Sequence, residues 1–371
     1  MKVQPIDTVA GERYILIGDD YEPVWEVNKY LKFQDNIGRS PNTQRSYAHD
    51  LCLFYRFMNE HGYEPLNLCM DKSKGPVDIL GEFVLWLQYP DYTRGILHFG
   101  SEDAARSDET VNRVMSTVLM FYRYLAQNKM IEQLDVYKFQ LAGGQFKPFL
   151  YSLVKNKREV QSSIFKKPTI KKPVEAITRK QYDELYSLCR SRRDKLLVAI
   201  LFEGGLRINE ALGLHICDVT QIEDGIVNIV ARENNENGAR VKRQAEGIII
   251  LPDYVIDLLV DYITEDLAES VSDFLFINQH GKTAGLPMRS GNVTKLFEGY
   301  SKKLGYHVNP HMLRHGFAQE KLEAGWPLEQ VQSYLRHRNP TSTEIYAQYT
   351  DAMKMREMKG FFLANNLSKE S

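Results

Sequence analysis

The sequence is poor in cysteine and lacks any long apolar segment. Its four cysteines are scattered over 371 residues and form no Cys-x-x-Cys pair, so neither a disulfide framework nor a cysteine zinc site is expected. No uninterrupted apolar run reaches the roughly 20 residues that cross a bilayer. The first residues also lack the charged-then-apolar pattern of a secretory signal. These absences predict a cytoplasmic protein with free thiols and no membrane contact.

The chain also lacks an overall excess of charge of either sign. It has 47 Lys and Arg against 48 Asp and Glu, a formal net charge of −1. The charge is uneven, however, because residues 155–180 hold nine Lys or Arg and two Glu, a local +7. Such a segment is either an electrostatic contact for a polyanion or a solvated linker, and this feature alone favours neither. The candidate contacts are Lys166, Lys167, Lys171 and Lys172.

Length and patterning predict two main domains, since a domain averages about 150 residues. Residues 1–24 have the β-rich run and turn of a small hairpin. Residues 25–154 are mostly helical in pattern, with helix starts at Trp25 and at Ser40-Pro41 and a stop at Gly62. Residues 155–174 are basic and interrupted by proline, which is typical of a linker.

The part of the chain from residue 175 onward mixes helices with a few strands. Thr178 is a good N-cap, and a later helix breaks at Gly204-Gly205 before another begins. Strands are expected at 226–232 and 247–251, joined by a polar turn with Asn237-Gly238. We therefore expect a mainly α protein with a small β-sheet, of the α+β class: a helical domain followed by a mixed α/β domain.

Four signals that bear on chemistry follow one another in the second half. They are Arg207 in GGLRINEAL, Lys242 in the polar turn, His311 with Arg314 three residues later, and His337 with Tyr346 nine residues later. Each alone is more often a packing or surface residue. Together they indicate chemistry on a phosphodiester.

The residue types suit phosphoryl transfer. The planar, permanently charged forks of Arg207 and Arg314 match the non-bridging oxygens of a phosphate, where negative charge gathers in the transition state. A histidine such as His311 exchanges protons near neutral pH. Lys242, on an expected flexible hairpin tip, is placed to protonate a leaving oxygen. Neighbouring cations stabilise the phenolate of Tyr346 as a nucleophile.

His311 and His315 also have the four-residue spacing of a metal-binding helix. However, Met312 stands where the metalloprotease pattern has Glu, and Arg314 repels a cation. The sequence therefore predicts no metal site.

On these motifs the sequence resembles the tyrosine recombinase family, the phage integrases, over about residues 175–350. The motifs are GLRINEALGL around Arg207, the His-x-x-Arg pair His311 and Arg314, the distal His337, and Tyr346 in STEIYAQY. DFLFIN and the Leu-Pro after the second strand match further family landmarks. The run NENGARVK and the N-terminal hairpin are similar to integrases and transposases of mobile elements in Gram-positive bacteria.

The resemblance implies a DNA-associated bacterial enzyme that cleaves and rejoins double-stranded DNA. Tyr346 attacks the scissile phosphate to give a 3′-phosphotyrosyl bond, Arg207, Arg314, His311 and His337 hold the phosphate, and Lys242 is the general acid. No metal and no nucleotide cofactor are implied. The implied assembly is a homotetramer on paired DNA sites, formed from a monomer or weak dimer, with accessory recombination or transposition proteins as further partners.

The resemblance also implies a role for each part of the chain. Residues 25–154 correspond to a core DNA-binding domain and 175–350 to the catalytic domain. The hairpin over 1–24 is a candidate arm-type DNA-binding element. The tail over 351–371, with Phe361-Phe362-Leu363, is expected to dock on a neighbouring protomer.

Three departures and two alternatives stay open at this point. Arg336 stands where the family usually has Gly, immediately before His337, and Tyr349 is a second candidate nucleophile. Near Lys242 there are three further cations: Arg232, Arg240 and Arg243. A type IB topoisomerase shares the chemistry but needs no synapsis of two sites. A catalytically silent DNA-binding regulator shares the scaffold but needs no nucleophile, which argues against it here.

Overall fold

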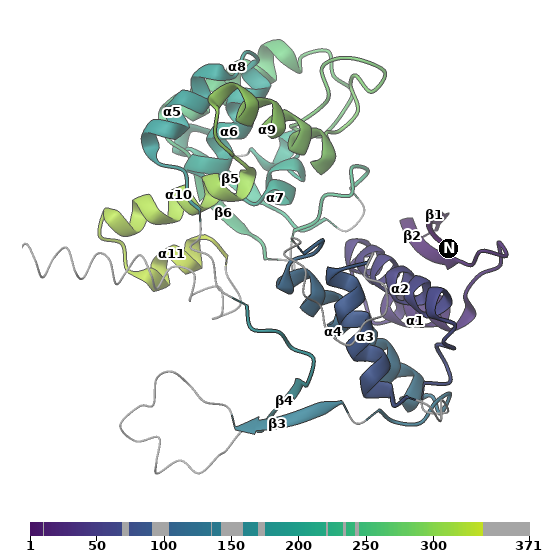
Figure 1. Ribbon diagram of the computed structural model, residues 1–371. Helices are drawn as coiled ribbons and strands as arrows, with labels where there is room; N and C mark the ends of the chain where they lie inside the picture. The colour runs from purple at the N-terminus through teal and green to yellow at the C-terminus, as the bar shows by residue number, and fades with distance from the viewer. Residues whose placement is uncertain are drawn as a thin grey trace, which may run out of the picture. The chain divides into compact units, whose positions relative to one another are not determined.

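The chain folds into two compact units, Met1–Lys171 and Lys172–Ser371, each with its own core (Figure 1). The computed structural model describes residues 1–9, 11–68, 74–90, 104–134, 136–141, 159–169, 175–219, 222–232, 235–241 and 245–336. The predictions for Lys171, Lys172, Lys242, His337, Tyr346, Tyr349 and the tail lie outside these residues.

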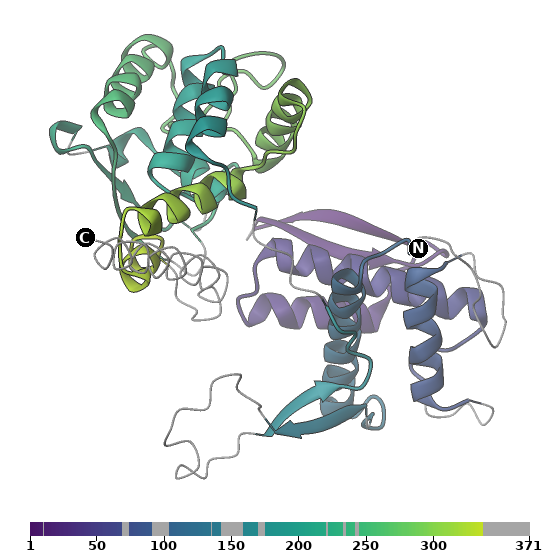
Figure 2. The ribbon, with the colours of Figure 1, turned by 60° about the vertical axis from the view of Figure 1, so that its left-hand side comes forward.

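The first unit begins with a β-hairpin that is part of the helical core. Strands β1 (Lys2–Thr8) and β2 (Gly11–Ile17) pair antiparallel, and Figure 2 shows them lying against α1 and α2. Leu16 of β2 is fully buried among helical residues. The Asn28 side chain accepts from the Leu16 amide at 2.9 Å and donates to its carbonyl at 3.0 Å. The hairpin is therefore fixed to the helices by both packing and hydrogen bonds.

Most of this core comes from helices of the described residues: α1 (Trp25–Asn36), α2 (Pro41–His61), α3 (Pro76–Gln88) and α4 (Asp108–Gln127). The predicted ends of α2 are confirmed, because the Ser40 hydroxyl accepts from the Thr43 amide at its start and Gly62 adopts a φ of +69° at its end. A buried carboxylate ties α2 to α4. Asp50 accepts from Arg113 at 2.6 Å and from the Thr117 hydroxyl at 2.8 Å.

A second antiparallel pair lies partly within the predicted linker. Strand β3 (Tyr137–Leu141) pairs with β4 (Glu159–Ser163). The chain after β4 is held to α4, since the Lys167 amide donates to Asn112 Oδ1 at 2.8 Å and Asn112 Nδ2 donates to the Lys167 carbonyl at 3.0 Å. Residues 159–167 therefore belong to the first unit.

The second unit is mainly helical and carries a small strand pair, which confirms the predicted α+β class. Its strands are β5 (Ile226–Ile229) and β6 (Gly247–Ile250), paired antiparallel. Its helices are α5 (Arg179–Leu188), α6 (Arg192–Glu203), α7 (Ile208–Leu212), α8 (Asp253–Asp261), α9 (Ser290–Leu304), α10 (Pro310–Glu323) and α11 (Leu328–Tyr334). The Thr178 hydroxyl caps α5 as predicted.

Helix α6 is the centre of this unit. All seven residues from Leu196 to Phe202 are buried, as expected for a helix that is apolar on every side. Helix α10 crosses it closely at Gly316. A Cβ there would lie 2.7 Å from Phe202 Cε2 and closer still to the Ile177 carbonyl oxygen. This close approach fixes α10, and therefore His311 and Arg314, against α6.

We predict opposite stability effects for two helical glycines. Gly316→Ala is expected to lower the free energy of unfolding by about 1–3 kcal/mol, because the backbone of Ile177 must move. Gly299→Ala in α9 is the matched control, since a Cβ there meets nothing within 4 Å, and it is expected to raise stability by about 0.5–1 kcal/mol. Urea unfolding followed by circular dichroism measures both. Equal effects of the two substitutions would contradict the packing described here.

Candidate active site

The site is built around the carboxylate of Glu210, which lies in α7 three residues after Arg207. Arg207 is the N-cap residue of α7, and its backbone amide donates to Glu210 Oε2 at 3.0 Å. Its guanidinium Nη1 donates to Oε1 at 2.5 Å. The chain reaches this turn through Gly205 at a φ of +59°, where a Cβ would lie 2.8 Å from side-chain carbons of Leu335 and Phe317. A glycine is thus required for the approach of the Arg207 turn to the neighbouring helices.

Arg314 comes to the same carboxylate from α10. The helix starts at Pro310, as predicted, and the Asn309 side chain accepts from the His311 and Met312 amides. Arg314 is only 3% exposed. It donates to the carbonyls of Gly205 and Leu335, each at 2.5 Å, and its Nη1 lies 3.5 Å from Glu210 Oε2. Its guanidinium therefore joins the α7 turn, α10 and the end of α11.

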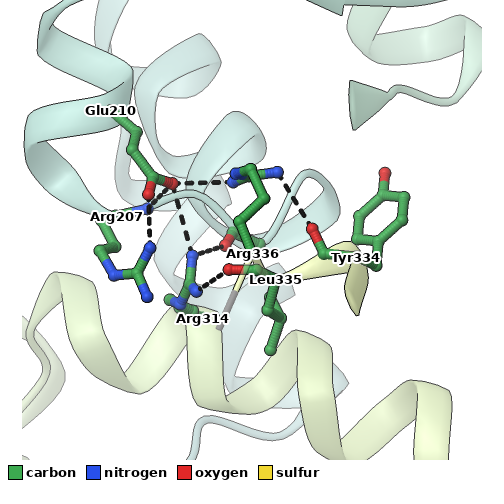
Figure 3. A network of polar contacts seen from close by, with 7 residues as sticks. Arg207, Glu210, Arg314, Tyr334, Leu335 and Arg336 are labelled. Carbon is green, nitrogen blue, oxygen red and sulfur yellow. Dashed lines mark hydrogen bonds and ion pairs between the residues drawn. The ribbon is translucent and has the colours of Figure 1, made fainter. Parts of the chain in front are cut away.

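A third arginine, Arg336, completes the cluster, and Figure 3 shows all three side chains converging on Glu210. Arg336 Nη2 donates to Glu210 Oε2 at 2.8 Å, and Nη1 donates to the Tyr334 carbonyl at 3.0 Å. Its φ of +55° places a non-glycine residue in the left-handed region. Arg336 stands where the resembled family usually has Gly, and its side chain contacts Glu210.

Three guanidinium groups around one carboxylate leave a net charge of +2 on the cluster. Burial favours the neutral form of Glu210 and on its own raises its pKa. This effect is outweighed by the positive charges of Arg336 and Arg314, by the hydrogen bond from the Arg207 amide and by the Arg207 guanidinium. The pKa of Glu210 is therefore lowered. The Arg207 side chain is 21% exposed, against 4% for Arg314 and 7% for Arg336. The excess positive charge is thus open to solvent mainly at Arg207, where an anion can bind.

The two histidines of α10 differ in environment. His311 is exposed in the first turn, on the same face of α10 as Arg314. Burial lowers the pKa of His315 to about 4, with smaller contributions from His311 and Arg314. His315 is therefore uncharged near neutral pH. Among the described residues, no group of three or more His, Cys, Asp or Glu side chains is arranged to hold a metal ion.

The connection between β5 and β6 is packed where the structure describes it. Asn237 Nδ2 donates to the carbonyls of Leu212 and Met288, both at 2.9 Å. Ala239 and Val241 are buried. The prediction of a flexible hairpin tip is therefore wrong for residues 235–241, which pack against α7. Lys242 itself lies outside the described residues.

The structure brings together only part of the predicted catalytic set. Arg207 and Arg314 share one carboxylate, and His311 lies one turn before Arg314. Glu210 and Arg336 were not predicted as site residues. The signal for Glu210 was present, because a Glu three residues after an N-cap position is typical of a capping box. Arg336 was noted only as standing where the family usually has Gly, and no local signal indicates that its side chain contacts Glu210.

Of the four lysines predicted to contact DNA, the two that the structure describes differ in their contacts. Lys166 is exposed, whereas the Lys167 ammonium contacts Gln88 Oε1 and lies 3.6 Å from Asp108 Oδ1. The positive charge of Lys167 is therefore partly neutralised within the first unit.

Comparisons with known proteins agree on one kind of protein. The phage integrase family model matches residues 175–353. Transposase A from transposon Tn554 of Staphylococcus aureus is 31% identical over 95% of each chain. The integrase of transposon Tn1549, solved in complex with transposon right end DNA, is similar at 18% identity and a TM-score of 0.57, covering 90% of this chain and 99% of that one. The XerH site-specific recombinase in its post-cleavage complex with difH DNA has a TM-score of 0.57 at 19% identity, covering 91% of this chain and 84% of that one.

We predict that Glu210 stabilises the second unit in a pH-dependent way. Glu210→Gln leaves the three arginines without a counter-charge, which is expected to cost about 3–5 kcal/mol at pH 7. Because the folded-state pKa of Glu210 is lowered, this contribution is fully present above the ordinary Glu pKa of about 4.3 and is lost as the pH falls through the folded value. Urea unfolding of both proteins between pH 3 and 7 measures it, with Glu298→Gln on the exposed side of α9 as control. A difference that stays constant over this range would refute the assignment.

Proposed function

This chain belongs to the phage integrase family of tyrosine recombinases, and we propose that Arg207 and Arg314 bind the scissile phosphate of DNA while Tyr346 attacks it. The chain is a DNA strand transferase that carries out site-specific recombination of a mobile element. The observation that supports the catalytic assignment is the shared carboxylate of Glu210, which holds Arg207 and Arg314 side by side. Two adjacent guanidinium groups suit two oxygens of one phosphodiester.

We propose the following course for the reaction. Tyr346 loses its phenolic proton to a neighbouring base such as His311. The phenolate then attacks phosphorus and forms a 3′-phosphotyrosyl bond as the bond to the 5′-oxygen breaks. Lys242 gives a proton to that leaving oxygen. Arg207, Arg314, His311 and His337 stabilise the charge on the non-bridging oxygens. Attack by a 5′-hydroxyl from a second strand then reverses the step and returns the tyrosine, so strand joining needs no nucleotide cofactor.

The site-specific reaction is favoured over the two alternatives. The similar proteins reported above are a transposase, a transposon integrase and a site-specific recombinase. None of these names describes a topoisomerase that relaxes supercoils or a silent regulator.

Double-stranded DNA is the partner, and we propose an assembly around it. Four protomers are expected on two paired sites, formed from a monomer or weak dimer, with residues 351–371 docking on a neighbouring protomer. Residues 25–154 are proposed to contact the core site and the hairpin over 1–24 an arm-type site. We also propose that accessory recombination or transposition proteins are further partners and that the protein is cytoplasmic. Among the described residues no helix is long and apolar enough to span a membrane.

We predict that Tyr346→Phe abolishes the covalent protein–DNA adduct while leaving DNA binding intact, because it removes only the attacking hydroxyl. The substrate is DNA from the ends of the element that carries the gene, nicked close to the cleavage position so that the adduct is trapped. The assay contains EDTA to exclude metal-dependent nucleases, and adduct appears as a shifted band. Tyr349→Phe is the matched control and is expected to cleave normally. An adduct that persists in Tyr346→Phe but disappears in Tyr349→Phe would overturn the assignment.

We predict unequal effects of two adjacent lysines on DNA binding. Lys166→Ala is expected to weaken binding to all sequences and to lower the slope of log K against log salt by about one, the contribution of one phosphate contact. Lys167→Ala is expected to change the slope less, because Asp108 already lies near its ammonium. Gel shifts over a range of salt concentrations measure both slopes. If the slope of log K against log salt is unchanged in Lys166→Ala, this part of the segment is a spacer and does not contact DNA.

A further inference from the structure

Arg336 adopts a backbone conformation that its residue type disfavours. Its φ is +55°, in the region where glycine has no steric cost and other residues do. Tyr21 and Lys129 are the other non-glycine residues with positive φ in the described ranges, and both are exposed. Arg336 is buried, with its side chain 7% exposed. A residue that is both strained and buried persists where its surroundings hold it in place.

The surroundings of Arg336 are matched to its side chain. Its aliphatic stem passes Gly247 at the start of β6, where a Cβ would lie 3.1 Å from Arg336 Cδ. Its two terminal nitrogens are occupied, one by Glu210 Oε2 and the other by the Tyr334 carbonyl. Its Nε is buried and has no hydrogen-bond partner among the residues that the structure describes. The guanidinium of Arg336 is therefore directed at Glu210.

Arg336 and Arg314 compete for the same oxygen. Arg336 Nη2 lies 2.8 Å from Glu210 Oε2, whereas Arg314 Nη1 lies 3.5 Å from it. Arg314 is instead held by the carbonyls of Gly205 and Leu335 at 2.5 Å. Without Arg336, the negative charge of Glu210 acts on Arg207 and Arg314 alone. The net charge of the cluster then falls from +2 to +1.

We propose that Arg336 is a positioning residue, which occupies Glu210 so that Arg207 and Arg314 keep their place and their positive charge for the DNA phosphate. The inference rests on the proposed function, because it takes Arg207 and Arg314 as the phosphate-binding pair. Arg336 acts on the reaction through Glu210. Its charge, and not its backbone conformation, is what the reaction uses.

Three substitutions separate charge from backbone conformation. Arg336→Gly removes the side chain and relieves the unfavourable φ. Arg336→Met removes the charge but keeps a long side chain and the unfavourable φ. Arg336→Lys keeps the charge but has one terminal nitrogen where arginine has two. Each variant is measured by single-turnover cleavage of the nicked DNA, by gel shift for DNA affinity and by circular dichroism for folding.

The charge role gives a defined pattern. Arg336→Gly and Arg336→Met are both expected to slow cleavage by roughly 10- to 100-fold, less than the roughly 10²- to 10³-fold typical of losing a direct transition-state donor. DNA affinity is expected to change by less than about twofold, since the loss falls on the transition state and not on binding. Arg336→Lys is expected to recover part of the rate.

A further comparison tests whether Arg336 acts through Glu210. In a Glu210→Gln background the carboxylate charge that Arg336 balances is gone. Arg336→Met is therefore expected to slow cleavage much less there than in the wild-type background, since residues that share a partner give non-additive effects. The same loss in both backgrounds would overturn the proposed route.

The remaining outcomes also decide the question. If Arg336→Gly cleaves at the wild-type rate, the inference is overturned. It is also overturned if Arg336→Lys cleaves no faster than Arg336→Met. If Arg336→Gly fails to fold, the comparison between the cleavage rates of Arg336→Lys and Arg336→Met decides the question. Wild-type protein that forms no adduct overturns the proposed function and this inference together. Wild-type protein that cleaves, beside variants that cleave equally well, overturns only the inference.

Discussion

One buried carboxylate, that of Glu210, sets the arrangement on which the rest of the second unit depends. Through Arg207, Arg314 and Arg336 it binds the turn before α7, helix α10 and the chain just after α11. A buried anion is unfavourable unless it is paired and hydrogen-bonded, and here both Oε atoms are occupied. The close approach at Gly205 and the unfavourable φ of Arg336 are maintained because this cluster and the packing around α6 hold them.

The sequence predicted the features that depend on near neighbours. Helix ends at Ser40, Gly62 and Thr178 were placed correctly, because a cap is a hydrogen bond or a φ value decided within three or four residues. The order and spacing of the motifs located Arg207 and Arg314 and the family. They did not show that one carboxylate joins these arginines, since that contact spans 104 residues.

The features that sequence reasoning missed depend on contacts between distant residues. Strand β4 lies in the segment whose charge and prolines indicated a linker, and β3 lies in the part predicted to be mostly helical. Their pairing joins residues that are 18 to 26 positions apart. The 235–241 segment looked like a free turn by composition, but its packing is decided by carbonyls of α7 and of Met288. Arg336 was noted as a departure from the family pattern. Its conformation and its partner were not predictable, because both depend on the space left beside Gly247. The catalytic roles of the whole set remain predictions: Arg207, Lys242, His311, Arg314, His337 and Tyr346.

The N-terminal hairpin has a consequence for how such proteins exchange parts over evolution. Leu16 is buried in the same core as Val27, Leu51 and Phe54 of the helices, and the Arg56 side chain on α2 donates to the Met1 carbonyl. A segment that completes another element's core cannot be swapped between lineages as an independent module, because its loss exposes the apolar face that it covered. The hairpin and the helices are therefore expected to be inherited together, with changes in the hairpin accompanied by compensating changes in α1 and α2.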